Sequence, residues 1–253
     1  MSSPALIRGC DAADIDGMVR NVSRIKAAGL DFVMTYLKYT KAEHITALHN
    51  AGLAVGLIFE AGTQNALQGA PQGTADRNRA GMQADAIGAP VGTPIFFTVD
   101  TDVANAASVK PYADAFGSSA GYADGNVLAG LNLRYPWLAG AMGWSGSRDY
   151  FTNGLWAICQ GTPMRGGHQL GMDWPDLGFE YDPDIARNLD WAWMPAGQPQ
   201  PSPSPTPVTA IPTAREMQTA LVAAGFDVGP SGIDGIWGDN SSDALWAYYN
   251  PNG

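Results

Sequence analysis

The segment Thr93-Pro-Ile-Phe-Phe-Thr-Val-Asp-Thr-Asp102 is the clearest indication of the fold, because it is an apolar, β-branched and aromatic run that stops on two carboxylates. Short continuous runs of this kind are typical of a strand buried on both faces, as in a parallel sheet. Asp100 and Asp102 are two residues apart, so we expect them on the same side of the strand's C-terminal end. In an α/β barrel that end carries the chemistry, and paired carboxylates cleave glycosidic bonds. The alternative is a pair of solvated Asp side chains where the chain leaves the core.

Strands and helices alternate along the chain before this stretch. We expect strands over residues 5–9, 31–37 and 53–59 and helices over 16–28, 40–50 and 74–87. Gly29 is expected to end the first helix as a C-cap, and Thr40 with Glu43 predicts a capping box at the start of the second. This order predicts a parallel sheet with right-handed crossovers.

After the stretch the alternation weakens. A helix over 104–116 is followed by a short, Gly-broken candidate strand at 118–124 and a helix at 126–133. Strands at 139–144, 154–159 and 178–182 then follow with few helices between them. The pattern predicts an α/β fold, a (βα)-barrel of TIM type with a helix-poor second half.

The composition changes at Gly197-Gln-Pro-Gln-Pro-Ser-Pro-Ser-Pro-Thr-Pro207, where Pro alternates with Ser, Thr and Gln. Such a segment forms an extended spacer with nothing to bury. We therefore expect a barrel over residues 1–196, a linker over 197–212 and a small all-α module over 213–253.

The charge balance excludes some functions. With a formal net charge of -10 and no cluster of Lys and Arg, the chain is not expected to bind nucleic acid or a membrane. The sequence has no signal-peptide pattern at its start, so we expect synthesis in the cytoplasm. Two Cys and three His lack metal-ligand spacing, and we expect two buried thiols, no metal site and no cofactor.

Acidic residues stand at the ends of several expected strands: Asp11, Glu60, Asp100, Asp102 and Asp182, followed by Asp184. Crowded carboxyl groups raise one another's pKa, so that one stays protonated as a general acid while a neighbour is ionised. Aromatic residues near the same ends are candidates for stacking on sugar rings or for filling the core: Tyr36, Tyr39, Trp144, Trp156 and Trp174. The acids are also candidate ligands for Mg²⁺ or Ca²⁺, which leaves a metal-dependent hydrolase as an alternative.

Residues 5–194 resemble the glycoside-hydrolase-like domains related to the family 25 lysozymes. The matching segments are Gly9-Cys-Asp11, Tyr36-Leu-Lys-Tyr39, Phe59-Glu60, Phe96–Asp102, Ala141–Gly146, Trp156-Ala-Ile-Cys-Gln160 and Tyr181–Asp184. The resemblance implies a barrel with five βα units and then three strands with few helices. It places Asp102 where the lysozymes have a Glu as general acid, and it places Asp11 and Asp182 in the same pocket. Gln160 joins Tyr36, Tyr39, Trp144 and Trp156 as a candidate substrate-binding residue.

Residues 213–249 resemble the type 1 peptidoglycan-binding module. The matching segments are Met217–Leu221, Gly225-Phe226, Gly232-Ile-Asp-Gly-Ile-Trp-Gly238 and Asp243–Trp246. Asp234 is expected to make a turn, which Trp237 pins to the helices. The resemblance implies bacterial peptidoglycan as the partner.

Two hypotheses follow. In the first, the protein is a peptidoglycan glycosidase of lysozyme type, in which Asp102 donates the proton, Asp100 orients or stabilises the reacting centre, and Asp11, Glu60 and Asp182 shape the charge of the pocket. In the second, it is a non-catalytic or weakly catalytic wall-binding component of a bacteriophage virion, such as a minor tail protein, with other tail proteins as partners. In either case we expect a bacteriophage product that acts at the bacterial cell wall, as a released endolysin or in the virion tail. An Asp is one methylene shorter than a Glu, which affects the reach of a general acid.

Overall fold

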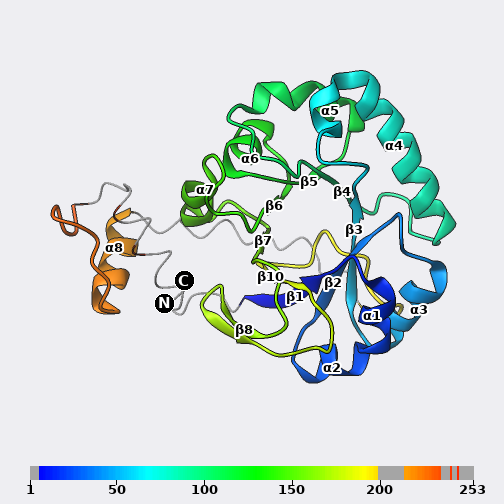
Figure 1. Ribbon diagram of the computed structural model, residues 1–253, viewed down its shortest axis with the longest axis horizontal. Helices are drawn as coiled ribbons and strands as arrows, with labels where there is room; N and C mark the ends of the chain where they lie inside the picture. The colour runs from blue at the N-terminus through cyan, green and yellow to red at the C-terminus, as the bar shows by residue number, and fades with distance from the viewer. Residues whose placement is uncertain (1–5, 199–213, 235–239, 241–243, 245–253) are drawn as a thin grey trace.

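The structure is a computed structural model that describes residues 6–198, 214–234, 240 and 244. Eight strands close into a barrel with helices around it, in the order β1-β10-β7-β6-β5-β4-β3-β2 (Figure 1). They are β1 (Ile7–Asp11), β2 (Phe32–Tyr36), β3 (Ala54–Phe59), β4 (Ile95–Thr98), β5 (Ala120–Ala123), β6 (Tyr135–Leu138), β7 (Ile158–Gln160) and β10 (Asp182–Ala186). The predicted α/β barrel is confirmed, and its Gly-broken fifth strand pairs with both β4 and β6.

The last strand runs against the rest. The pairs from β1 through β2 to β7 are parallel, whereas β10 is antiparallel to both β1 and β7. The expected strand at 178–182 was wrong in its bounds, because the strand begins at Asp182 instead of ending there. Since β10 is reversed, its first residue lies at the same end of the barrel as the last residues of the parallel strands.

Helices cover the outside of the barrel (Figure 1). They are α1 (Ile15–Arg20), α2 (Val22–Ala27), α3 (Ala42–Asn50), the 3-10 turn η1 (Asn65–Gln68), α4 (Gly69–Ala86), the 3-10 turn η2 (Ala106–Ser108), α5 (Lys110–Phe116), α6 (Gly125–Leu131) and α7 (Ser147–Asn153). Between β7 and β10 the described chain forms only the hairpin of β8 (Gly167–Gln169) and β9 (Met172–Trp174). The predicted shortage of helices therefore applies to the segment after α7.

Several local predictions were wrong. The expected helix 16–28 is divided at Asn21, whose side chain donates to the Gly17 carbonyl. The expected capping box does not form, because the Thr40 hydroxyl donates to the Tyr36 carbonyl and the His44 ring accepts from the Lys41 N–H. The helix expected over 74–87 begins earlier, because a 3-10 turn leads directly into α4 at Gly69.

The expected strand at 139–144 is a loop, and the strand lies just before it, at β6. The small residues of that loop allow a close approach of two backbones. A Cβ atom built on Gly140 lies 2.0 Å from the Gly161 carbonyl oxygen, which leaves no room for a side chain. The segment is thus constrained by backbone packing beside the barrel end.

Strand alternation divides the core into two layers. One layer fills the barrel interior, and its largest buried side chains are Phe32, Phe96, Trp137 and Trp191. The other layer lies between the strands and the helices and contains both thiols, Cys10 and Cys159, which are buried and unbridged. Trp191 makes edge contacts with Phe32 at 5.2 Å and with Phe96 at 5.7 Å between ring centroids.

In the C-terminal segment, α8 (Ala214–Ala223) is followed by Gly225 at φ +90°. Leu221 and Val228 are buried, and the Gln218 side chain donates to Asp234 at 2.9 Å. Most of the expected linker and last helix, and Trp237, lie outside the described residues. Within the described residues, no helix is long and apolar enough to cross a membrane.

Candidate functional site

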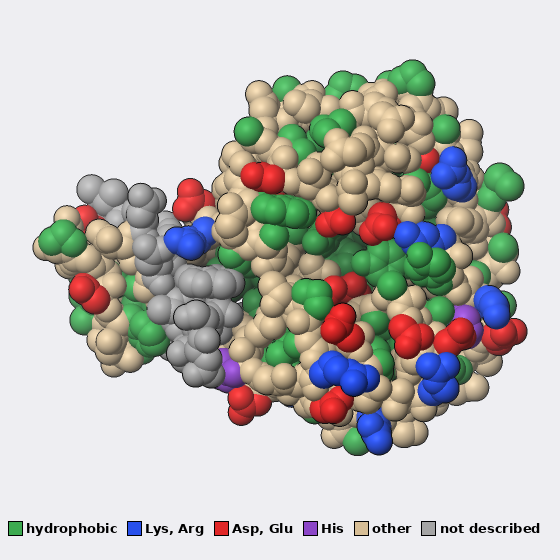
Figure 2. Space-filling model, in the orientation of Figure 1, with side chains coloured by type: hydrophobic (Ala, Val, Ile, Leu, Met, Phe, Trp, Pro, Cys, Tyr) green, Lys and Arg blue, Asp and Glu red, His purple; other side chains and the backbone are tan. Residues whose placement is uncertain are grey.

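Side chains from six strands form a polar layer inside the barrel, at the end where the parallel strands finish. They are Asp11, Tyr36, Thr98, Tyr122, Gln160 and Asp182. The layer lies above the apolar interior that Trp137 and its neighbours fill. Figure 2 shows acidic side chains gathered around the hollow in this face.

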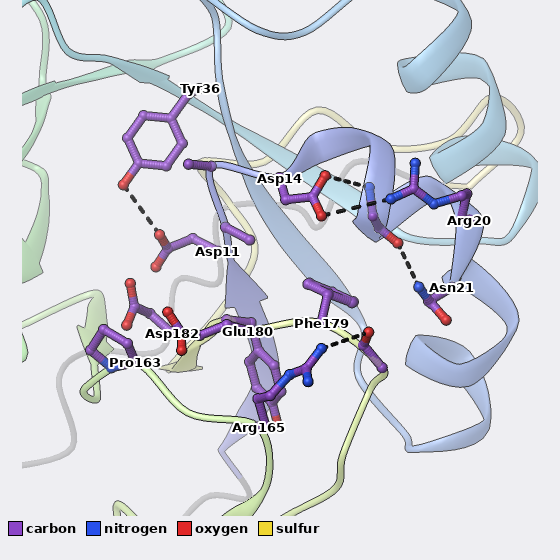
Figure 3. A pocket seen from close by; sticks show the side chains of 15 residues that line it. Asp11, Asp14, Arg20, Asn21, Tyr36, Pro163, Arg165, Phe179, Glu180 and Asp182 are labelled. Carbon is purple, nitrogen blue, oxygen red and sulfur yellow. Dashed lines mark hydrogen bonds and ion pairs between the residues drawn. The ribbon is translucent and has the colours of Figure 1, made fainter.

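Two cavities meet over this layer. The first, about 310 Å³, is lined by Glu60, Asp100, Tyr122, Trp137, Trp144 and Gln160 among others. The second, about 520 Å³, is lined by Asp11, Asp14, Arg20, Arg165 and Glu180 among others (Figure 3). Tyr36, Pro163 and Asp182 line both, so the cavities form one groove that crosses the carboxyl groups. A groove of this kind leaves room for substrate on both sides of a reacting bond.

Gln160 orients the centre of the site. Its Oε1 accepts from the Tyr122 hydroxyl at 2.9 Å and from the Gly140 N–H at 3.3 Å. Because these donors fix the carbonyl side of the amide, its NH₂ group faces the acids. It donates to Asp11 Oδ2 at 2.8 Å and to Asp182 Oδ2 at 3.5 Å.

Asp11 and Asp182 differ in their hydrogen bonding. Asp11 also accepts from the Tyr36 hydroxyl at 3.3 Å (Figure 3). Burial raises the pKa of Asp11 to about 7, although the hydrogen bonds from Gln160 and Tyr36 oppose the shift. Burial and the charge of Asp11 raise the pKa of Asp182 to about 8, and its Oδ1 is buried without a hydrogen-bond partner. Near neutral pH the hydrogen bonds therefore favour a protonated Asp182 beside an Asp11 that ionises more readily.

The opposite wall of the first cavity carries two more acids. Burial and the charge of Glu60 raise the pKa of Asp100. Glu60 accepts from Lys38 Nζ at 3.0 Å, and that ammonium group also lies 4.9 Å from the centre of the Tyr39 ring. The groove thus has carboxyl groups on both walls, and Lys38 forms an ion pair with one of these groups, Glu60.

Three predicted site residues of the barrel line neither cavity. Asp102 is exposed, and its Oδ1 accepts from the Ser145 N–H at 2.8 Å, so the structure does not bring it together with Asp100 in the groove. Tyr39 is 47% exposed beside Lys38. Trp156 is 5% exposed and stacks on Phe151, which is the core-filling alternative for this side chain. Asp234 and Trp237 belong to the C-terminal segment, where only Asp234 is described.

Sequence reasoning missed Tyr122, Trp137 and Thr98 as cavity-lining residues. Each faces inward by strand parity, and Thr98 pairs with Tyr122 across β4 and β5. If the weak fifth strand is placed at 120–123, strand alternation puts the Tyr122 side chain inside the barrel. In the described chain, no group of three or more His, Cys, Asp or Glu has the geometry to hold a metal ion.

This arrangement is suited to proton transfer at a bond lying across the groove. A protonated carboxyl can donate to a leaving oxygen while a neighbouring carboxylate stabilises developing positive charge. The aromatic Trp144 and Tyr36 offer flat faces in the same groove.

Comparisons with known proteins agree with this fold. The family described as Rv2525c-like, glycoside hydrolase-like domain matches residues 21–130. The crystal structure of the Tat-secreted protein Rv2525c of Mycobacterium tuberculosis, in complex with L-tartrate, is 18% identical, with a TM-score of 0.56 over 74% of this chain and 97% of that chain. The same protein in complex with HEPES is 19% identical, with a TM-score of 0.54 over 73% and 96%.

A weaker likeness, with a TM-score of 0.45 and 12% identity, covers 73% of this chain and 47% of the modular autolysin LytC from Streptococcus pneumoniae in complex with a synthetic peptidoglycan ligand. No curated protein gives a significant match. The family match includes Glu60 and Asp100 but ends before β7 and β10, which carry Gln160 and Asp182. Residues 21–130 thus match a glycoside hydrolase-like family, and the (βα)-barrel is similar in fold to Rv2525c.

Proposed function

We propose that the barrel is a glycoside hydrolase that cleaves bacterial peptidoglycan, with its carboxyl groups acting at the middle of the groove. The observation that carries the proposal is the pair Asp11 and Asp182. They lie opposite each other at the barrel mouth, and their different hydrogen bonds favour opposite protonation states. Two carboxyl groups kept in different states by their surroundings are the usual means of glycoside cleavage.

In this proposal Asp182 donates the proton to the leaving oxygen. Its pKa of about 8 keeps it protonated at neutral pH, and it lines both halves of the groove. Asp11, held by Gln160 and Tyr36, stabilises the positive charge that develops on the sugar ring. Asp102, which the sequence favoured as the donor, instead accepts a main-chain N–H outside the groove.

Peptidoglycan is proposed as the substrate because of the C-terminal segment, which resembles the type 1 peptidoglycan-binding module in sequence. A wall-binding module joined to a glycosidase raises the local concentration of a substrate that cannot diffuse. We place the action of the protein at the bacterial cell wall, either as a released endolysin or within a virion tail. Co-purification with virion particles would separate these two settings.

The decisive experiment is digestion of purified sacculi by the full chain, followed by mass spectrometry of the released fragments. We expect new reducing ends at one type of glycosidic bond, in amounts that increase with time. Fragments cut only in the peptide stems, or no fragments from sacculi of several wall chemistries, would contradict the proposal.

A second candidate function is wall binding without turnover, as in a minor tail protein. The position of Asp102 favours it, because the lysozymes it resembles carry their general acid there and here the side chain lies outside the groove. In that case the protein sediments with sacculi, yet no new reducing ends appear. Binding with turnover would exclude this candidate.

A further inference from the structure

One buried carboxyl group lies below the groove and has no part in the function proposed above. Asp184 is fully buried inside the barrel, two residues along β10 from Asp182. Its Oδ1 accepts from the Trp137 indole N–H at 3.1 Å. Its Oδ2 is buried and accepts from no N–H or hydroxyl group, and the Asp11 carboxyl lies within hydrogen-bonding reach of this side chain.

Two carboxyl groups can share a hydrogen bond only if one of them carries the proton. Asp11 accepts from the Gln160 amide and the Tyr36 hydroxyl, and these donors favour its ionised form. Asp184 accepts from one indole and has no contact with solvent, so ionising it is costlier. The shared proton therefore belongs to Asp184, on the oxygen that otherwise lacks a partner.

We infer that Asp184 is a permanently neutral acid that donates its carboxyl proton to Asp11 as a hydrogen bond, and that it thereby positions the Asp11 carboxylate for reaction. It acts through Asp11 and lines neither cavity, so it is a positioning residue. Its catalytic consequence rests on the proposed glycosidase function, whereas its protonation state does not.

The surroundings of Asp184 support this state. The titratable groups that act on it or are acted on by it come from four strands: Asp11 and Cys10 on β1, Tyr122 on β5, Cys159 on β7 and Asp182 on β10. These Asp, Cys and Tyr side chains are neutral when protonated and negative when deprotonated, so none of them can stabilise a negative charge on Asp184 by charge attraction. Arg187 lowers the pKa of Cys159, whereas the groups that shift the pKa of Asp184 are Asp11, Asp182 and Trp137. Burial, followed by the charges of Asp11 and Asp182, raises the pKa of Asp184.

The test uses matched variants and carbon-13 NMR of the Asp carboxyl groups in the full chain, measured from pH 4 to 9. In the wild type we expect the Asp184 signal at the position of a protonated carboxyl throughout. In Asp184→Asn the amide keeps a donor toward Asp11 and an acceptor toward Trp137, so the midpoint of Asp11 titration should change by less than about half a pH unit. In Asp184→Leu the donor is lost, and the midpoint should rise by about one pH unit or more.

An ionised Asp184 gives the opposite result, because Asp184→Asn then removes a neighbouring negative charge and lowers the Asp11 midpoint by more than about one unit. That outcome, or a wild-type Asp184 signal that titrates below pH 7, would overturn the inference. If Asp184→Leu does not fold, the wild type and Asp184→Asn still show whether Asp184 is neutral or ionised.

Rates on sacculi form a separate readout. If Asp184 positions Asp11, Asp184→Asn keeps the wild-type pH profile of the rate. In Asp184→Leu, the limb of that profile that reflects the ionisation of Asp11 shifts to higher pH together with the NMR midpoint of Asp11. A wild type without turnover contradicts the proposed glycosidase, while the NMR result still stands or fails by itself.

Discussion

Asp11 and Asp182 are directly opposite each other in the register of β1 and β10, although the two strands run in opposite directions. One residue ends its strand and the other begins its own. The closing strand thereby brings a second carboxyl group to the mouth of the barrel, where the two groups meet with Gln160 between their Oδ2 atoms.

Replacing Asp182 by Asn should abolish most activity on sacculi, because the protonated carboxyl in the groove is lost. We expect a fall in kcat of about 10²- to 10⁴-fold. Asp102→Asn is the matched control, and it should stay within about threefold of the wild type because that side chain lines neither cavity. The reverse order of effects would assign the proton to Asp102. Release of reducing ends over time measures both.

The stability of the fold should decrease as the pH rises from 4 to 8. Burial raises the pKa of Asp11 to about 7 and that of Asp182 to about 8, so the folded chain holds protons in this range that the unfolded chain has released. The free energy of unfolding therefore falls with pH, by on the order of 2 kcal/mol or more for the pair. Thermal melts at fixed ionic strength measure the change. Asp182→Asn should flatten the slope, and a slope equal to that of the wild type would contradict this origin.

Gln160→Leu should raise the midpoint at which Asp11 titrates, because the amide N–H that stabilises the carboxylate is removed. It should also lower kcat by about tenfold or more, since Asp11 is then protonated at neutral pH. Tyr122→Phe is a milder control, as the Gln160 carbonyl keeps the Gly140 N–H as a donor. Carboxyl NMR and the pH profile give the two readouts. Equal effects in the two variants would mean that Gln160 does not set the state of Asp11.

Asp124→Ala should destabilise the barrel by about 2 kcal/mol. The buried Asp124 carboxylate accepts from the Val127 N–H at the start of α6 and from the Val103 N–H at 2.7 Å. Asn105→Ala removes a similar but exposed bond to Ala107 and should cost less than about 1 kcal/mol. Urea titrations compare the two. A smaller effect at Asp124 than at Asn105 would show that the loop at Val103 is held by other contacts.

Gly140→Ala should destabilise the fold by about 2 kcal/mol or more and distort the groove, because the new Cβ would lie 2.0 Å from the Gly161 carbonyl oxygen. Gly143→Ala, three residues further along the same loop, has nothing within 4 Å of the new atom and should be near neutral. Thermal melts of both variants test the close approach. Equal melting temperatures would contradict it.

Much of the barrel could be predicted from the sequence, because buried parallel strands read as short apolar runs. Asp11 and Tyr36 end β1 and β2 as expected, and Asp100 follows β4 into the groove. The position of Asp182 at the mouth was expected for a wrong reason, since a reversed strand cannot be recognised from its own composition. Pairing with β1 and β7 determines its direction, and those partners are far away in sequence.

The orientation of side chains after a strand end was less predictable. Strand alternation holds to Thr98 and Asp100, but the chain then turns and the Asp102 carboxylate accepts the Ser145 N–H, 43 residues later. Trp156 likewise lies near a strand, yet its ring stacks on Phe151 and its indole N–H donates to the Phe151 carbonyl. Local patterns locate such residues near the barrel end without showing which way they point.

The reversed direction of β10 also determines how the protein can be extended. After Ala186 the chain leaves at the end of the barrel where the parallel strands begin, and there Trp193 bridges Val55 and packs against His49. The carboxyl groups lie at the other end. Whatever follows residue 198 is therefore joined to the face opposite the groove, so that an appended segment can be exchanged, lengthened or removed during evolution without altering the chemistry at the mouth.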